Sequence, residues 1–198
     1  MVAGTYQRSY ASNHKVKSSY SYNLVRGKTV KPLVVFYSRT GTTKKVGEAL
    51  ADLLQCDSEE LIDTKKRTGP LGFLRSGRDA ARNKLTVLEP LIHDPALYDV
   101  VALGTPVWSG LMSSPMRTYI TINKSKFSGV AFFCTQGGNE NRKLFDDMQA
   151  LCGRSPVSVL ALRASVVKNE EYNERLRQFA GALQTQSDAN AATTSEDR

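Results

Sequence analysis

Residues 33–43, which read LVVFYSRTGTT, join a short apolar run to a turn that is rich in hydroxyl groups. Residues 33–37 are aliphatic or aromatic without a break, which predicts a strand buried on both faces. Residues 43–55 then carry apolar side chains at helical spacing, which predicts an amphipathic helix. A strand, a polar turn and a helix in this order form the repeating unit of α/β proteins.

The same unit recurs along the rest of the chain. Further strands are predicted at residues 59–62, 98–103, 130–134 and 157–162, and further helices in the second half of 69–84 and at 115–122, 141–151 and 170–183. Strands that alternate with helices of this length predict a parallel sheet with right-handed crossovers. The predicted fold class is therefore α/β with a five-stranded parallel sheet, and ligands are expected beyond the carboxyl ends of the strands.

Composition limits the class of protein. The chain has 198 residues, of which 40% are hydrophobic and 23% charged, as in ordinary globular proteins and unlike collagen-like or wholly disordered chains. It contains no apolar run of the length that spans a bilayer. Its cysteines, at positions 56, 134 and 152, lack the spacing of a disulfide framework or a zinc site, which favours a reducing, cytoplasmic location.

Both ends of the chain differ from its middle. Residues 1–31 lack apolar periodicity and acidic residues, and their basic residues are Arg8, Lys15, Lys17, Arg26, Lys28 and Lys31. Residues 185–198 are polar and also lack periodicity. Neither segment can bury enough apolar surface to offset its ordering entropy, so both are predicted to be disordered tails around a domain of residues 32–184. An organelle transit peptide in residues 1–31 is the alternative.

The turn after the first strand, called the hydroxyl loop here, is a candidate phosphate site. It consists of Ser38, Arg39, Thr40, Gly41, Thr42 and Thr43. Hydroxyls and backbone N–H groups at a helix N-terminus suit a phosphate, whose charge the helix dipole also favours. The alternative is an ordinary turn in which a threonine caps the helix. The Walker loop and the G-x-G-x-x-G fingerprint are both absent from this segment.

Two more loops follow strands at the same predicted edge. The tryptophan loop consists of Thr105, Pro106, Val107, Trp108, Ser109 and Gly110, and the glycine loop of Thr135, Gln136, Gly137, Gly138 and Asn139. An aromatic side chain at a strand end can lie against a flat ring, and glycines let the backbone approach a ligand closely. The alternatives are a core tryptophan and a plain turn.

With these loops in place, residues 32–184 resemble the flavodoxin family. The resemblance rests on Ser38-x-Thr40-Gly41-x-Thr43 between strand and helix, with the two other loops in the matching positions. It implies a three-layer sandwich with sheet order 2-1-3-4-5 and non-covalently bound FMN. The implied phosphate contacts are Ser38, Thr40, Thr42 and Thr43 with the backbone of Arg39 and Gly41. The tryptophan loop would line one side of the flavin and the glycine loop the other.

Basic residues set this chain apart from the acidic flavodoxins that it resembles. Arg39, Lys44 and Lys45 lie in or beside the hydroxyl loop. Arg75, Arg78 and Arg82 share one face of a predicted helix, which is either a solvated surface or a lid or docking surface for an anionic substrate or an acidic partner. These residues leave the identity of the partner open.

The sequence offers no catalytic acid, base or metal site. Cys134 is predicted to be a small buried thiol, and His14 and His93 have no catalytic grouping around them. The predicted function is electron transfer through FMN, with a redox protein or a small molecule as partner and no nucleic acid. The alternatives are an FMN-dependent reductase of a quinone or porphyrinogen, and a cofactor-free binding module of the same shape.

Overall fold

The computed structural model describes residues 30–65, 67, 69–138 and 142–185. The predicted tails, residues 1–31 and 185–198, lie outside this part of the chain except for residues 30, 31 and 185. Their predicted disorder, and the domain limits at residues 32 and 184, therefore stay predictions.

Five parallel strands form the centre of the molecule. They are β1 (Pro32–Phe36), β2 (Asp57–Glu60), β3 (Val100–Trp108), β5 (Val130–Gln136) and β6 (Val159–Arg163), in the order β2-β1-β3-β5-β6. This confirms the predicted order 2-1-3-4-5. The sequence did not predict the two-residue strand β4 (Leu111–Met112), which pairs antiparallel with the end of β3.

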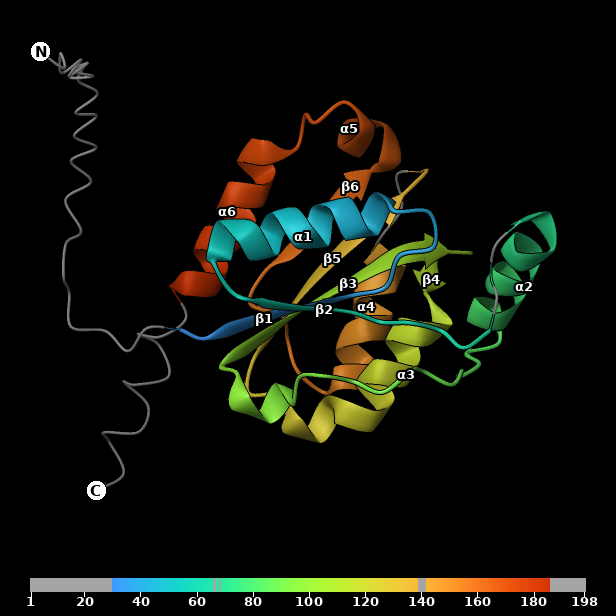
Figure 1. Cartoon of the computed structure of the whole chain (residues 1–198), viewed down its shortest axis with the longest axis horizontal. Helices are drawn as coiled ribbons and strands as arrows, with labels where there is room; N and C mark the ends of the chain where they lie inside the picture. Colours follow the sequence, from blue (N-terminus) through green and yellow to red (C-terminus); the bar gives the residue numbers. More distant parts are fainter. Residues whose placement is uncertain (1–29, 66, 68, 139–141, 186–198) are drawn as a thin grey trace, which may run out of the picture.

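Helices cover both faces of the sheet, as predicted for a three-layer sandwich. The helices α1 (Thr42–Leu54) and α6 (Asn173–Gln184) lie on one face, and α3 (Ser114–Asn123) and α4 (Arg142–Cys152) on the other (Figure 1). Alternation along β1 explains both cores, because Val34 and Phe36 join the α1 and α6 layer whereas Leu33 and Val35 join the α3 and α4 layer.

Several predicted boundaries were wrong. The strand predicted at 59–62 begins at Asp57, and α2 (Gly69–Ala81) is helical from its first residue rather than only in its second half. Prediction also missed the short helix α5 (Ala164–Lys168) and the single 3-10 turns Pro95–Leu97 and Lys124–Lys126. The remaining ends shift by a few residues, because neighbouring elements decide where pairing stops.

Helix α2 stands at the carboxyl end of the sheet, outside the two helical layers (Figure 1). It packs against β3, β4 and α3. The segment between α2 and β3 contributes Leu88 and Leu91, which pack against the core. None of the helices that the structure describes is long and apolar enough to cross a membrane.

Candidate functional site

The hydroxyl loop turns the chain from β1 into α1. The N-cap of α1 is Gly41, in a left-handed conformation with φ 87°, and no side chain caps the helix. Glycine suits this position because a side chain would be strained there. The alternative reading of a threonine cap is therefore wrong. An uncapped N-terminus of a 13-residue helix keeps its positive end available to an anion.

The hydroxyls of this loop lie in different surroundings. Thr40 is exposed and Thr42 half-buried, whereas Thr43 is buried. Ser38 Oγ is buried without a hydrogen-bond partner in the part of the chain that the structure describes. Buried hydroxyls are normally hydrogen-bonded, so the Ser38 hydroxyl is suited to a ligand.

The glycine loop meets the hydroxyl loop at the same edge of the sheet. Thr135 and Gln136 are the last residues of β5, and Thr135 Oγ1 lies 2.7 Å from Thr43 Oγ1. Gln136 Oε1 is buried and has no hydrogen-bond partner among the described residues. Gly137 and Gly138 are exposed with open space beside them, and Asn139 lies outside the described residues.

The tryptophan loop is mostly strand. Thr105, Pro106, Val107 and Trp108 continue β3, so the prediction of a loop over these residues was wrong. The strand is longer because its pairing with β5 reaches Pro106 and its hairpin with β4 includes Val107 and Trp108. The remaining turn is Ser109 and Gly110, both with positive φ.

The side chain of Thr105 is engaged within the protein. Its Oγ1 accepts a hydrogen bond from Ser113 N at 3.1 Å and lies 3.0 Å from Ser113 Oγ. Ser113 is in turn the N-cap of α3. Thr105 therefore joins β3 to the start of α3, and its predicted contact with a flavin stays a prediction.

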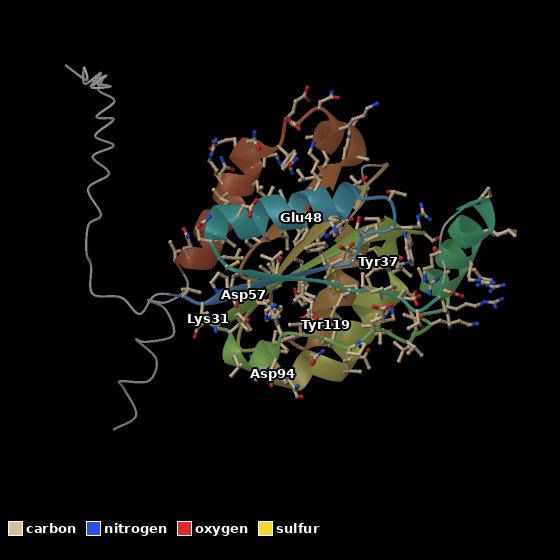
Figure 2. The ribbon with its side chains drawn as sticks, in the orientation of Figure 1. Lys31, Tyr37, Glu48, Asp57, Asp94 and Tyr119 are labelled. Atoms are coloured by element: carbon tan, nitrogen blue, oxygen red, sulfur yellow. The ribbon has the colours of Figure 1, made fainter. Side chains whose placement is uncertain are left out.

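Trp108 is part of the core, as the alternative reading had it. Trp108 is 5% exposed, and its ring meets the ring of Tyr37 edge-on, with 5.5 Å between the two ring centres. The guanidinium carbons of Arg67 and Arg39 lie 5.4 and 5.8 Å from the centre of the Trp108 ring. Figure 2 shows Tyr37 at the end of the sheet that faces α2, whereas Lys31 and Asp57 mark the opposite end.

Solved structures of flavoproteins share the fold of this chain. A flavoprotein in complex with FMN from Lactobacillus acidophilus NCFM is 26% identical over 71% of this chain and 97% of that chain, with a TM-score of 0.58. A putative flavoprotein from Bacteroides uniformis is 23% identical over 73% of this chain and 99% of that one, with a TM-score of 0.60.

Oxidised flavodoxin 2 from Bacillus cereus covers 77% of this chain and 97% of its own, at 18% identity and a TM-score of 0.51. The chain has the flavodoxin-like fold. No protein-family model and no curated protein matches the sequence.

A buried ion cluster borders the site of this flavodoxin-like chain, and sequence reasoning missed it. Arg67 is 3% exposed; its Nε donates to Asp63 Oδ2 and its Nη1 to Asp79 Oδ2, the latter at 3.1 Å. Thr86 Oγ1 also donates to Asp63, at 2.7 Å. The two carboxylates raise the pKa of Arg67 although burial lowers it. Asp63, Arg67 and Asp79 show no motif in the sequence, because only the fold brings them together.

A cavity of about 220 Å³ lies between this cluster and the hydroxyl loop. Its lining residues are Tyr37, Ser38, Arg39, Leu61, Ile62, Asp63, Lys65 and Arg67. Burial, followed by the charge of Asp63, raises the pKa of Tyr37 to about 12. The phenol of Tyr37 is therefore neutral at physiological pH, and the cavity combines apolar walls with cationic groups.

The lysines next to the hydroxyl loop are paired with carboxylates. Lys44 Nζ lies 2.6 Å from Glu60 Oε2, and Lys45 Nζ lies 2.7 Å from Glu170 Oε1. The hydrogen bond that Lys44 donates to Glu60 raises the pKa of Lys44, and the one that Lys45 donates to Glu170 lowers the pKa of Glu170. Much of the positive charge that the sequence places beside this loop is thus compensated locally.

Sequence predictions were also made for one cysteine and two histidines near or outside the predicted site. Cys134 is fully buried, which confirms the prediction of a buried thiol, and burial raises the pKa of this thiol to about 12. The Nδ1 atom of His93 lies 3.0 Å from Tyr98 Oη, whereas His14 lies outside the described residues. Among the residues that the structure describes, no group of histidine, cysteine and acidic side chains could hold a metal ion.

Proposed function

We propose that this chain binds FMN non-covalently at the carboxyl edge of its sheet and transfers electrons through it. The observation that carries the proposal is a pair of buried polar atoms, Ser38 Oγ and Gln136 Oε1, without hydrogen-bond partners among the described residues. Ser38 follows β1 and Gln136 ends β5, and the Thr43–Thr135 contact joins these two parts of the sheet edge. The 26% identical flavoprotein solved with FMN supports the same ligand.

The phosphate of FMN would lie at the N-terminus of α1. Ser38, Thr40 and Thr42 would donate hydroxyl hydrogen bonds, and the backbone of Arg39 and Gly41 would complete the cradle. The hydroxyl of Thr43 is engaged with Thr135. We therefore assign Thr43 the role of holding the two loops together rather than that of a side-chain ligand.

The flavin ring would lie between the end of β3 and the glycine loop. Val107, Trp108, Ser109 and Gly110 would border one side, and Gln136, Gly137 and Gly138 the other. FMN supplies the capacity to take up and release electrons. The chain orients the ring and excludes water from it, and Gln136 Oε1 is available to accept a hydrogen bond from the ring edge.

A small-molecule reductase is the second candidate. The cavity of about 220 Å³ beside the hydroxyl loop favours it, because Tyr37, Leu61 and Ile62 offer apolar contact and Lys65 a positive charge. Steady oxidation of NADH or NADPH by the FMN-loaded chain with a quinone acceptor would support a reductase. Absence of turnover, together with electron exchange with a redox protein, would support a carrier.

Binding of FMN and of riboflavin tests the proposal. A hydrogen bond to a charged phosphate is worth about 1.5 to 3 kcal/mol, so Thr40→Ala and Ser38→Ala should each weaken FMN about tenfold or more. Riboflavin, which lacks the phosphate, should bind these variants like the wild type. Ser125→Ala changes an exposed hydroxyl outside the loop and serves as the control.

Two results would contradict the proposal. The first is that the purified chain binds neither FMN nor riboflavin in a titration of flavin fluorescence. The second is an equal loss of both ligands in the two loop variants, which would place the phosphate elsewhere. A cofactor-free binding module would give the first result.

A further inference from the structure

Helix α2 exposes leucines and arginines on one face. Leu71 is 83% exposed and Leu74 70% exposed, and Arg75, Arg78 and Arg82 are exposed as well. Residues spaced by three and four positions share a side of a helix. Isolated exposed leucines are common, but Leu71 and Leu74 lie one helical turn apart beside three arginines, a combination that suits a protein partner. We call these five residues the α2 face.

The opposite side of α2 is held against the preceding segment by an ion pair and by a close approach of the backbone. Asp79 accepts a hydrogen bond from buried Arg67, which lies before the helix, whereas the hydrogen bond from Ser76 Oγ to the carbonyl of Gly72 stays within α2. A side chain at Gly72 would overlap the backbone of Arg67, so this turn of the helix lies directly on the preceding segment. The α2 face is thus presented outward by a packed helix.

The charge of the α2 face is poorly compensated. Arg75 and Arg82 have no carboxylate within ion-pair distance among the described residues, and Arg78 reaches only Asp79, at 3.8 Å, which Arg67 already binds. Lys65 and Lys84, which flank the helix in sequence, are exposed too. A partner with clustered carboxylates around an apolar contact would complement this surface.

The α2 face lies beside the proposed flavin site. A Cβ atom added to Gly77 would be 3.0 Å from Ser109 Oγ, so α2 touches the turn that follows Trp108. Figure 1 shows α2 next to β4 at the carboxyl end of the sheet. A protein bound to the α2 face would therefore be held next to the edge through which electrons would enter or leave.

We propose that the α2 face docks an acidic redox partner protein, an inference that rests on the proposed function. Redox encounters use small, charge-steered interfaces, which fits two leucines surrounded by cations. A membrane surface is less well suited, because the large apolar side chains that α2 exposes among those the structure describes are Leu71 and Leu74, and they stand beside three arginines. A second copy of this chain would bring cationic faces together.

Binding of an acidic plant-type ferredoxin, measured by calorimetry at low ionic strength, tests the surface. The reverse-charge variant Arg75→Glu with Arg82→Glu should weaken binding about tenfold or more and reduce its dependence on salt. Arg154→Glu with Arg177→Glu makes the same charge change on the α4–β6 connection and α6, and should weaken binding by about threefold at most. Arg78 is left unchanged because it lies near Asp79.

A second variant separates apolar contact from charge. Leu71→Ser with Leu74→Ser should weaken binding while leaving its salt dependence as in the wild type. Thermal unfolding of each variant shows whether α2 and the core remain intact. Equal weakening in the two charge variants would refute docking at α2, because net charge alone would then explain the interaction.

Other occupants give different results. The chain could bind phosphatidylserine vesicles but not ferredoxin, and lose this binding in the Arg75 and Arg82 variant. That result would show that the α2 face binds a membrane and not a protein. If the wild type sediments as a dimer and the same variant as a monomer, the occupant of the α2 face is a second copy of this chain. Calorimetry with the FMN-free chain keeps the two proposals apart: docking without any FMN binding would refute the proposed function and leave the acidic-partner surface standing.

Discussion

The side chains of Thr43 and Thr135 are 92 residues apart in the sequence, yet their Oγ1 atoms lie 2.7 Å from each other in a buried position. Thr43 is near the start of α1 and Thr135 near the end of β5. Strand β3 lies between β1 and β5 in the sheet, so the contact crosses over it. This hydrogen bond joins the hydroxyl loop to the glycine loop.

Removing one hydroxyl of this pair should destabilise the fold. Thr43→Val leaves the Thr135 hydroxyl buried without its partner, at a cost of about 1 to 3 kcal/mol. Thr43→Ser keeps the hydroxyl and should cost less. Urea unfolding of Thr43→Val, Thr135→Val and the double variant gives the coupling energy, and strictly additive effects would show that the two hydroxyls do not interact.

Arg67 should be necessary for the position of α2. Arg67→Met leaves both Asp63 and Asp79 buried without their cation, and breaking a buried pair costs about 3 to 5 kcal/mol. Adding Asp79→Asn removes one of the two uncompensated charges and should recover part of the loss. Unfolding measurements check both values.

The fluorescence of Trp108 gives a second measurement of the effect of Arg67→Met. It is the single tryptophan of the chain, and Arg67 lies 5.4 Å from its ring centre. Its fluorescence should therefore change in Arg67→Met under native conditions. An unchanged spectrum with unchanged stability would show that the ion cluster contributes nothing to this region.

The buried thiols should make the fold sensitive to alkali. Burial raises the pKa of both Cys134 and Cys152 from 9.0 to about 12. Between these values the unfolded chain loses thiol protons that the folded chain retains, so unfolding releases protons and stability falls as pH rises. The contribution is complete below pH 9 and decreases by about 1.4 kcal/mol per pH unit for each thiol.

Cys134→Ala isolates this effect. Its free energy of unfolding should fall less steeply than that of the wild type between about pH 9 and pH 11, although a cavity lowers its stability at every pH. Cys152→Ala should behave in the same way. Parallel curves for wild type and variants would show that the thiols titrate alike in both states.

Gly104 should tolerate no side chain while Phe133 is present. A Cβ atom at Gly104 would overlap the tip of the Phe133 ring on the neighbouring strand. Gly104→Ala should therefore destabilise the fold by about 1 to 3 kcal/mol or more. Phe133→Leu replaces the ring by a shorter side chain. The double variant should therefore lose less free energy of unfolding than the sum of the losses in the two single variants. Additivity would show that the strain is relieved elsewhere.

The alternation of apolar strands and amphipathic helices was sufficient to predict the parallel sheet and the edge at which the loops meet. The order of the strands came from the resemblance to the flavodoxin family. Residues 33–37 are buried as predicted, because an unbroken apolar run has only one stable place in a layered α/β fold. The hydroxyl loop was predicted for the same local reason, since its residues follow one another in the chain.

Only the tertiary structure decided the contacts between distant segments. The strand character of residues 105–108 depends on pairing with β4 and β5, and the burial of Trp108 depends on Tyr37 and Arg67. The cluster of Asp63, Arg67 and Asp79 has no sequence pattern, because its partners meet only when α2 packs beside the sheet. Local sequence determines which elements form, whereas burial and pairing determine which side chains remain available to a ligand.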